Sequence, residues 1–172
     1  MDTGTFYATT SAVSFTLLGF WWVVVQFRHD ELTSDGPRRN LAFVVSLHFV
    51  IPGIMSLASL LAGDNGILWR IAFASAGVLG LLAVVIVGRS AVPGATGAMA
   101  TVQRFEWFVA PLYIVLTAVA LAPEIARQGL GLQPLQVEGY VLTTIVLLGI
   151  LFAWALFTEP VTKPHDRDAE AH

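Results

Sequence analysis

Residues 41–63, which read LAFVVSLHFVIPGIMSLASLLAG, form an uncharged apolar run that decides the fold class of this chain. A helix needs about 20 apolar residues to cross a hydrocarbon core of about 30 Å. Four more runs of similar length and composition occur at residues 8–27, 67–88, 105–122 and 140–157. We therefore predict an all-α protein, a polytopic membrane helical bundle with five transmembrane helices. Residues 1–157 form its single domain.

The overall composition is typical of an integral membrane protein. The chain has 172 residues, of which 56% are hydrophobic and 12% are charged, against about 25% charged in an ordinary soluble domain. It contains no cysteine, which excludes disulfides, thiolate metal sites and iron–sulfur ligation. A net charge of −3 argues against nucleic-acid binding, which usually depends on a positively charged surface. Residues 158–172 are rich in charge and contain two prolines, so we predict a disordered cytoplasmic tail there.

The basic residues predict an orientation. Two of them would lie in one set of loops, Arg70 and Arg127. The other seven would lie on the opposite side: Arg28, Arg38, Arg39, Arg89, Arg104, Lys163 and Arg167. Because cytoplasmic loops carry the excess of Lys and Arg, we predict an outside N-terminus and a cytoplasmic C-terminus. An odd number of spans requires the same arrangement, and the cytoplasmic (inner) membrane is the expected location.

Small residues mark the helix faces that we expect to pack. Residues 67–88 carry four of them on one face, at spacings of three or four: Ala72, Ala76, Gly80 and Ala83. Small-xxx-small spacing lets two backbones approach closely in lipid. Gly149 and Ala153 repeat this spacing in the last span, and we predict that they are its internal partner. The same faces would suit a homo-oligomer or a larger membrane complex.

Four polar residues within the spans are candidates for chemistry. His48 would lie roughly 11 Å past the cytoplasmic edge of its span, where an ionisable group is costly and is by default a functional hypothesis. Glu106 opens the fourth span from the same side and would reach the histidine. Tyr113 and Thr117 share a helix face at the i, i+4 spacing. Each also has a structural interpretation, as a hydrogen-bonding residue between helices or, for Glu106, as a headgroup-level charge.

These residues leave three functions open. Few polar groups and several small-residue faces favour a non-catalytic accessory subunit, with the lipid bilayer and other membrane chains as partners. The alternative is a small oligomeric channel or proton-coupled transporter that uses His48 and Glu106. A third is a haem-binding electron-transfer protein with a histidine ligand. A single intramembrane histidine makes a poor metal site, so no metal and no cofactor are expected, and the chain has no HExxH, GxSxG or nucleotide-binding loop.

Overall fold

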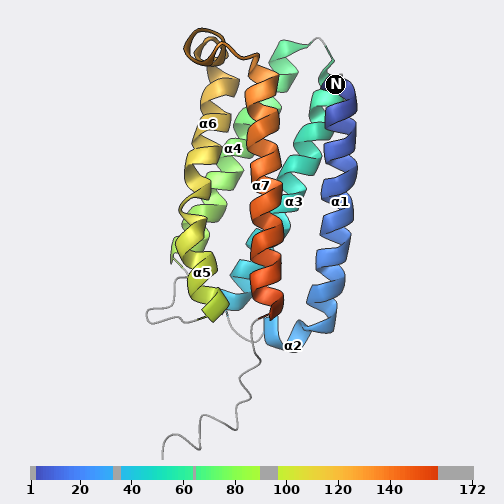
Figure 1. The fold of residues 1–172 in the computed structure, drawn as a ribbon, viewed down its shortest axis with the longest axis vertical. Helices are drawn as coiled ribbons and strands as arrows, with labels where there is room; N and C mark the ends of the chain where they lie inside the picture. The colour runs from blue at the N-terminus through green and yellow to red at the C-terminus, as the bar shows by residue number, and fades with distance from the viewer. Residues whose placement is uncertain (1–2, 33–35, 64, 90–96, 159–172) are drawn as a thin grey trace, which may run out of the picture.

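The computed structural model describes residues 3–32, 36–63, 65–89 and 97–158. This part of the chain is helical, with no strands. Four helices are long and apolar enough to cross a membrane: α1 (Thr3–Phe27), α3 (Gly36–Ala62), α4 (Gly66–Arg89) and α7 (Pro134–Thr158). They run side by side along the long axis (Figure 1). The chain is therefore an all-α membrane helical bundle, as the apolar runs predict.

Short helices complete the bundle. α2 (His29–Leu32) is one turn between α1 and α3, where the sequence predicts only a loop. α5 (Gly97–Glu106) and α6 (Val109–Leu121) follow one another along the bundle (Figure 1). The segment η1 (Ile125–Leu130) is a single stretch of π-helix that lies across the end of the bundle where α1 begins.

The predicted fourth span, residues 105–122, is wrong as one continuous helix. The helix breaks at Trp107 and Phe108, and α6 has only 13 residues, or about 20 Å at 1.5 Å per residue. Pro111 explains the restart, because it falls in the first turn of α6, where its missing N–H removes no intrahelical hydrogen bond. α5 and α6 together still run the length of the bundle (Figure 1).

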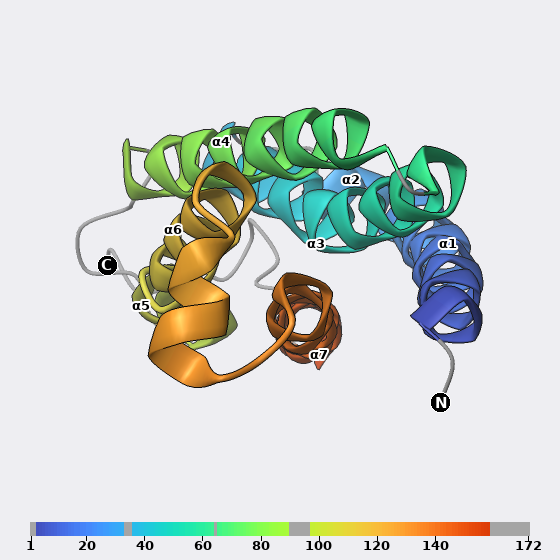
Figure 2. The same cartoon turned by 90° about the horizontal axis from the view of Figure 1, so that it is seen from above.

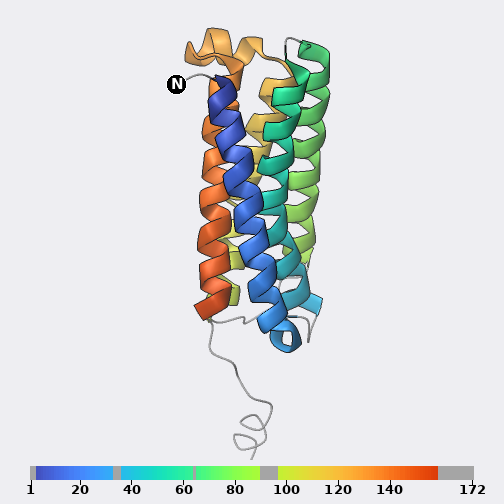
Figure 3. The same cartoon turned by 90° about the vertical axis from the view of Figure 1, so that its right-hand side faces the viewer.

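α1, α3, α4 and α6 form an arc, and α7 closes it. α1 packs on α3, α3 on α4 and α4 on α6, while α7 contacts α1, α3, α5 and α6. Seen from above, α7 lies on the inner side of this arc (Figure 2). The N-terminus and the end of α7 lie at opposite ends of the bundle (Figure 3). The described chain thus passes from one end to the other an odd number of times.

The connection between α3 and α4 lies at the end of the bundle where α1 begins, and its residues favour a tight turn. Gly63 adopts a left-handed φ of 51° after α3, a conformation that costs glycine little. The Asn65 side-chain oxygen then accepts hydrogen bonds from the backbone N–H groups of Ile67 and Leu68, both at 3.2 Å, which is an N-cap for α4. α3 and α4 are therefore joined by a tight turn, as the Gly63–Gly66 segment predicts.

Candidate functional site

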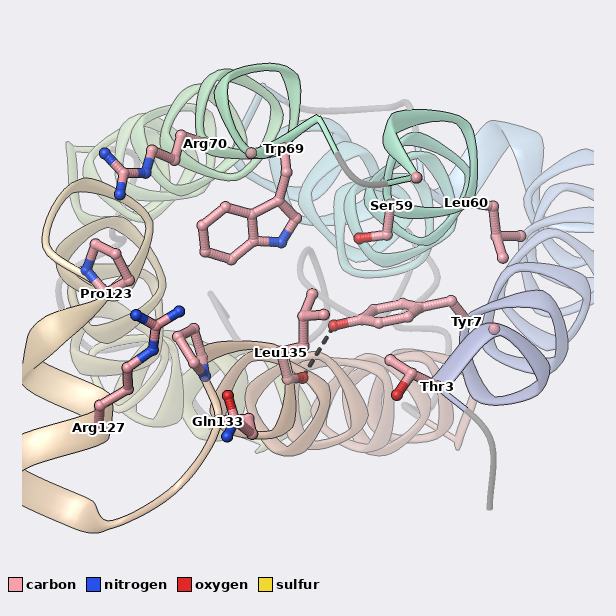
Figure 4. Close-up of a pocket in the computed structure, with 14 residues that line it drawn as sticks. Thr3, Tyr7, Ser59, Leu60, Trp69, Arg70, Pro123, Arg127, Gln133 and Leu135 are labelled. Atoms are coloured by element: carbon pink, nitrogen blue, oxygen red, sulfur yellow. Dashed lines mark hydrogen bonds between the residues drawn. The ribbon is translucent and has the colours of Figure 1, made fainter.

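A cavity opens at the end of the bundle where α1 begins, and we call it the N-terminal cavity. Its volume is about 490 Å³. Residues from α1, the end of α3, the start of α4, the η1 region and the start of α7 line it (Figure 4). Five separate segments thus converge on one space, and its size lies within the range of about 300–1,000 Å³ typical of small-molecule sites.

Two arginines lie on one side of the N-terminal cavity. Arg70 comes from the first two turns of α4 and Arg127 from η1, and both flank Pro123 (Figure 4). Arg127 pairs with Glu124 at 3.6 Å, but the two side chains are 56% and 60% exposed. An exposed pair of this kind is weak. The Arg127 guanidinium therefore remains available to an anion that enters the cavity.

Polar side chains occupy the other side. The Tyr7 hydroxyl donates a 3.0 Å hydrogen bond to the Leu135 carbonyl and so joins α1 to α7. Ser59 lies across from Tyr7, and the Trp69 indole stands between these residues and the arginines (Figure 4). The Ser59 hydroxyl and the Trp69 indole N–H are buried, with no hydrogen-bond partner among the described residues. Buried polar groups normally have partners, so these two are suited to bind water or a ligand.

Glu138 lies on α7 about one helical turn beyond Leu135, which lines the cavity, and it is not among the residues that the sequence singles out. It is 0% exposed, and neither carboxyl oxygen has a hydrogen-bond partner among the described residues. The Trp69 indole and the Tyr7 ring, which line the cavity, both lie within interaction range of this carboxyl. The last apolar run begins at residue 140, so Glu138 stands just outside the span that the sequence predicts. Pro134 was the available signal, because proline is favoured at the first helical position, and α7 does begin there.

His48 is buried between helices and reaches none of the cavities described for this chain. It is 1% exposed. Its Nδ1 donates to the Val44 carbonyl of the same helix at 2.9 Å, and its ring packs edge-on against Phe152 of α7, with 5.3 Å between ring centroids. The N-terminal cavity, the groove between α3 and α4 and a small hollow near Trp22 do not include it.

Tyr113 and Thr117 lie together, on the face of α6 that packs against α4. The Thr117 hydroxyl donates to the Tyr113 carbonyl at 2.8 Å. A methyl group added to Gly77 would overlap the Thr117 side chain, and one added to Gly80 would overlap the Tyr113 ring. These contacts bring α4 and α6 together away from His48. Glu106 ends α5, and its side chain lies outside the described residues.

The predicted partner of the small face of α4 is wrong. Ala76, Gly80 and Ala83 are buried and Ala72 is half-buried, but α4 packs on α3 and α6, and makes no substantial contact with α7. Gly149 instead approaches α3, since an added Cβ would lie 2.7 Å from the His48 Cβ and 2.9 Å from the Phe49 ring. Ala153, also on α7, is half-buried.

Within the described ranges, no group of three or more His, Cys, Asp or Glu residues could hold a metal ion. Comparison with known proteins gave no matching family model, no similar curated protein and no similar solved structure. The N-terminal cavity is the place in the described chain where charged, polar and aromatic side chains from five segments meet.

Proposed function

We propose that this protein is a non-catalytic membrane component that binds a small molecule with an anionic group in the N-terminal cavity. The observation that carries this proposal is the placement of Arg70 and Arg127, from separate elements, on one side of the same cavity. Two guanidinium groups suit a phosphate, sulfonate or carboxylate, because each offers a planar fork of N–H donors.

The rest of the cavity supports an organic ligand over a bare ion. The Trp69 ring offers a flat apolar surface, and Ser59 and Tyr7 add hydroxyl groups across from the arginines. A site with a mostly apolar wall and few polar groups is typical of small-molecule binding. By the distribution of basic residues, this end would face the outside of the cytoplasmic membrane. A lipid headgroup and a soluble organic anion would both have access to it.

A role as an accessory subunit is the second candidate. It is favoured by an apolar groove of about 370 Å³ between α3 and α4, lined by residues such as Leu47, Ile54 and Leu79. Such a groove would suit one apolar helix of a homo-oligomer or of a larger complex. Native mass spectrometry of the protein released from nanodiscs tests it: a single unaccompanied chain would argue against this role.

Transport through His48 and haem ligation by His48 gain no support from the geometry. His48, Tyr113 and Thr117 do not line a shared cavity. The space around the imidazole is filled by Phe152 and by the close approach of Gly149. A porphyrin beside this histidine would have to displace packed side chains of α3 and α7, and a transport route would need to open between the same helices.

Binding to nanodisc-embedded protein tests the proposal. The soluble probes are inorganic phosphate, glycerol phosphate and succinate. To test lipid headgroups as ligands, binding is compared between nanodiscs of anionic phosphatidylglycerol and nanodiscs of phosphatidylcholine. We expect at least one probe to bind, and either Arg70→Gln or Arg127→Gln to weaken binding about 10- to 100-fold, since a hydrogen bond to a charged group contributes about 1.5–3 kcal/mol.

Arg104→Gln is the matched control. Arg104 is an exposed arginine of α5, at the other end of the bundle, so this variant should bind as the unaltered protein does. If a soluble probe binds in nanodiscs of both lipids, the cavity is a site for a soluble anion. If no soluble probe binds but binding to the protein differs between the two lipids, the cavity is a site for a lipid headgroup. Equal affinity in all three arginine variants, or no binding of any probe, would overturn the proposal.

A further inference from the structure

Four helices each contribute one polar side chain at or next to the N-terminal cavity. They are Tyr7 of α1, Ser59 of α3, Trp69 of α4 and Glu138 of α7. The first three line the cavity and lie together on one side of it (Figure 4). Glu138 is buried on α7, about one helical turn beyond Leu135, which also lines the cavity, and its carboxyl interacts with Tyr7 and Trp69. The four groups therefore form one polar cluster that extends from the cavity to a buried carboxyl group.

Among the described residues, no ion pair joins Glu138 to a cationic side chain, and its two carboxyl oxygens have no hydrogen-bond partner. Arg70 and Arg127 lie across the cavity from Tyr7 (Figure 4). A buried carboxylate without a counter-charge is strongly unfavourable. The carboxyl group therefore needs a proton or another cation to neutralise it.

We propose that Glu138 is a proton-binding site that is loaded from the N-terminal cavity. A water molecule in the cavity gives up the proton: its O–H bond breaks, a new O–H bond forms on a Glu138 oxygen, and a proton from the bulk buffer neutralises the hydroxide that remains. The Ser59 hydroxyl can accept one proton and donate another, so it suits the relay. The Tyr7 hydroxyl would do the same after it turns away from the Leu135 carbonyl. The Trp69 N–H is a donor only and suits a group that holds the carboxyl in place.

A coupling follows if the proposed function also holds. An anion bound by Arg70 and Arg127 would place a second negative charge above Glu138. Like charges in a medium of low dielectric repel strongly, so the bound anion would favour the protonated carboxyl. The cavity would then take up an anion and a proton together. This coupling alone rests on the proposed function; the proton site itself does not.

Infrared difference spectroscopy of the protein in nanodiscs tests the proton site. A protonated carboxyl group gives an acid carbonyl band that shifts in deuterated water. We expect this band in the unaltered protein and in Glu124→Gln, which alters an exposed carboxylate at the same end of the bundle. We expect its loss in Glu138→Gln, which keeps the shape of the side chain. A band that persists in Glu138→Gln, or no acid band in the unaltered protein at any pH, would overturn the proposal.

The rate of deuterium exchange at the same band tests the route. Tyr7→Phe removes one relay hydroxyl and should slow the exchange several-fold. Tyr140→Phe makes the same change at a lipid-facing residue of α7 that is 67% exposed and should leave the rate unaltered. Equal rates in both variants would refute entry through the cluster. If Glu138→Gln does not fold, the pH dependence of the acid band in the unaltered protein and in Glu124→Gln remains decisive.

The two proposals fail separately. An acid band assigned to Glu138 without any anion binding would support the proton site and overturn the proposed function. Anion binding by the arginines without an acid band would do the reverse. If both are present, anion binding should tighten as the pH falls in the unaltered protein and should be insensitive to pH in Glu138→Gln.

Discussion

Replacing Gly80 by alanine should destabilise the contact between α4 and α6. The added methyl group would overlap three ring carbons of Tyr113, whose side chain is 1% exposed and cannot swing into open space. Overpacking of this kind costs about 1–3 kcal/mol. Alanine recovers up to about 1 kcal/mol through its better helix propensity, so the net loss should be about 0–2 kcal/mol.

Gly19→Ala provides the matched control for this loss. Gly19 also lies inside a long helix, but a Cβ added there meets nothing within 4 Å. Only the helix-propensity gain of up to about 1 kcal/mol remains, and the two variants should differ by about 1–3 kcal/mol. For a chain of this size each kcal/mol corresponds to about 2–4 °C in Tm. Thermal unfolding in one detergent should therefore separate the variants by about 2–12 °C.

A double-mutant cycle assigns the loss to the ring. In a Tyr113→Ala background the added methyl group at Gly80 has space, so Gly80→Ala should be close to neutral there even though Tyr113→Ala is itself destabilising. Equal Tm values for Gly80→Ala and Gly19→Ala would refute the close approach of α4 and α6. An unchanged cost of Gly80→Ala in the Tyr113→Ala background would refute the role of the ring.

Three further variants test other contacts. Trp21→Phe removes an indole N–H that donates to the Ala42 carbonyl at 3.1 Å, so the free energy of chemical unfolding should fall by about 0.5–1.5 kcal/mol. Trp22→Phe, at a residue 57% exposed, should lower it less. A larger loss in Trp22→Phe than in Trp21→Phe would contradict the role given to the Trp21 hydrogen bond. Arg28→Gln removes guanidinium hydrogen bonds of 2.9 and 2.6 Å to the last carbonyls of α7, so amide exchange should rise in the last turn of α7 and stay unaltered in α3; protection that stays the same in both would show that the contact is dispensable. His48→Leu replaces a buried imidazole by an aliphatic side chain of similar size and removes the hydrogen bond to the Val44 carbonyl, and it should alter Tm by less than about 4 °C, equivalent to about 1 kcal/mol. A larger loss would show that the imidazole contributes more to stability than this one hydrogen bond.

The apolar runs could predict the bundle because lipid imposes a length on each helix. The runs at 8–27, 41–63, 67–88 and 140–157 coincide with observed long helices, apart from Gly63, which follows the end of α3. Their ends were less predictable, since α7 begins six residues before its run, at Pro134. The break before Val109 was hidden in an apolar sequence, because hydropathy does not report where backbone hydrogen bonding stops. The position of Pro111 was the one local sign of it.

The cavity was harder to predict than the helices. Its polar groups come from five segments, and spacing along one helix does not report which residues of different helices meet. Arg70 was identified in the sequence as charged, but its pairing with Arg127 across a cavity depends on where η1 lies. The sequence singles out His48 because ionisable residues are rare within membrane spans. It gives no such signal for Glu138, which stands outside the predicted span.

The position of α7 has a consequence for biogenesis. α7 is synthesised after the helices that form the arc, yet it closes that arc and carries Glu138. Before α7 inserts, Tyr7, Ser59 and Trp69 have no carboxyl group to face. A nascent chain stalled before residue 134 would thus expose this polar flank, and insertion of α7 would cover it.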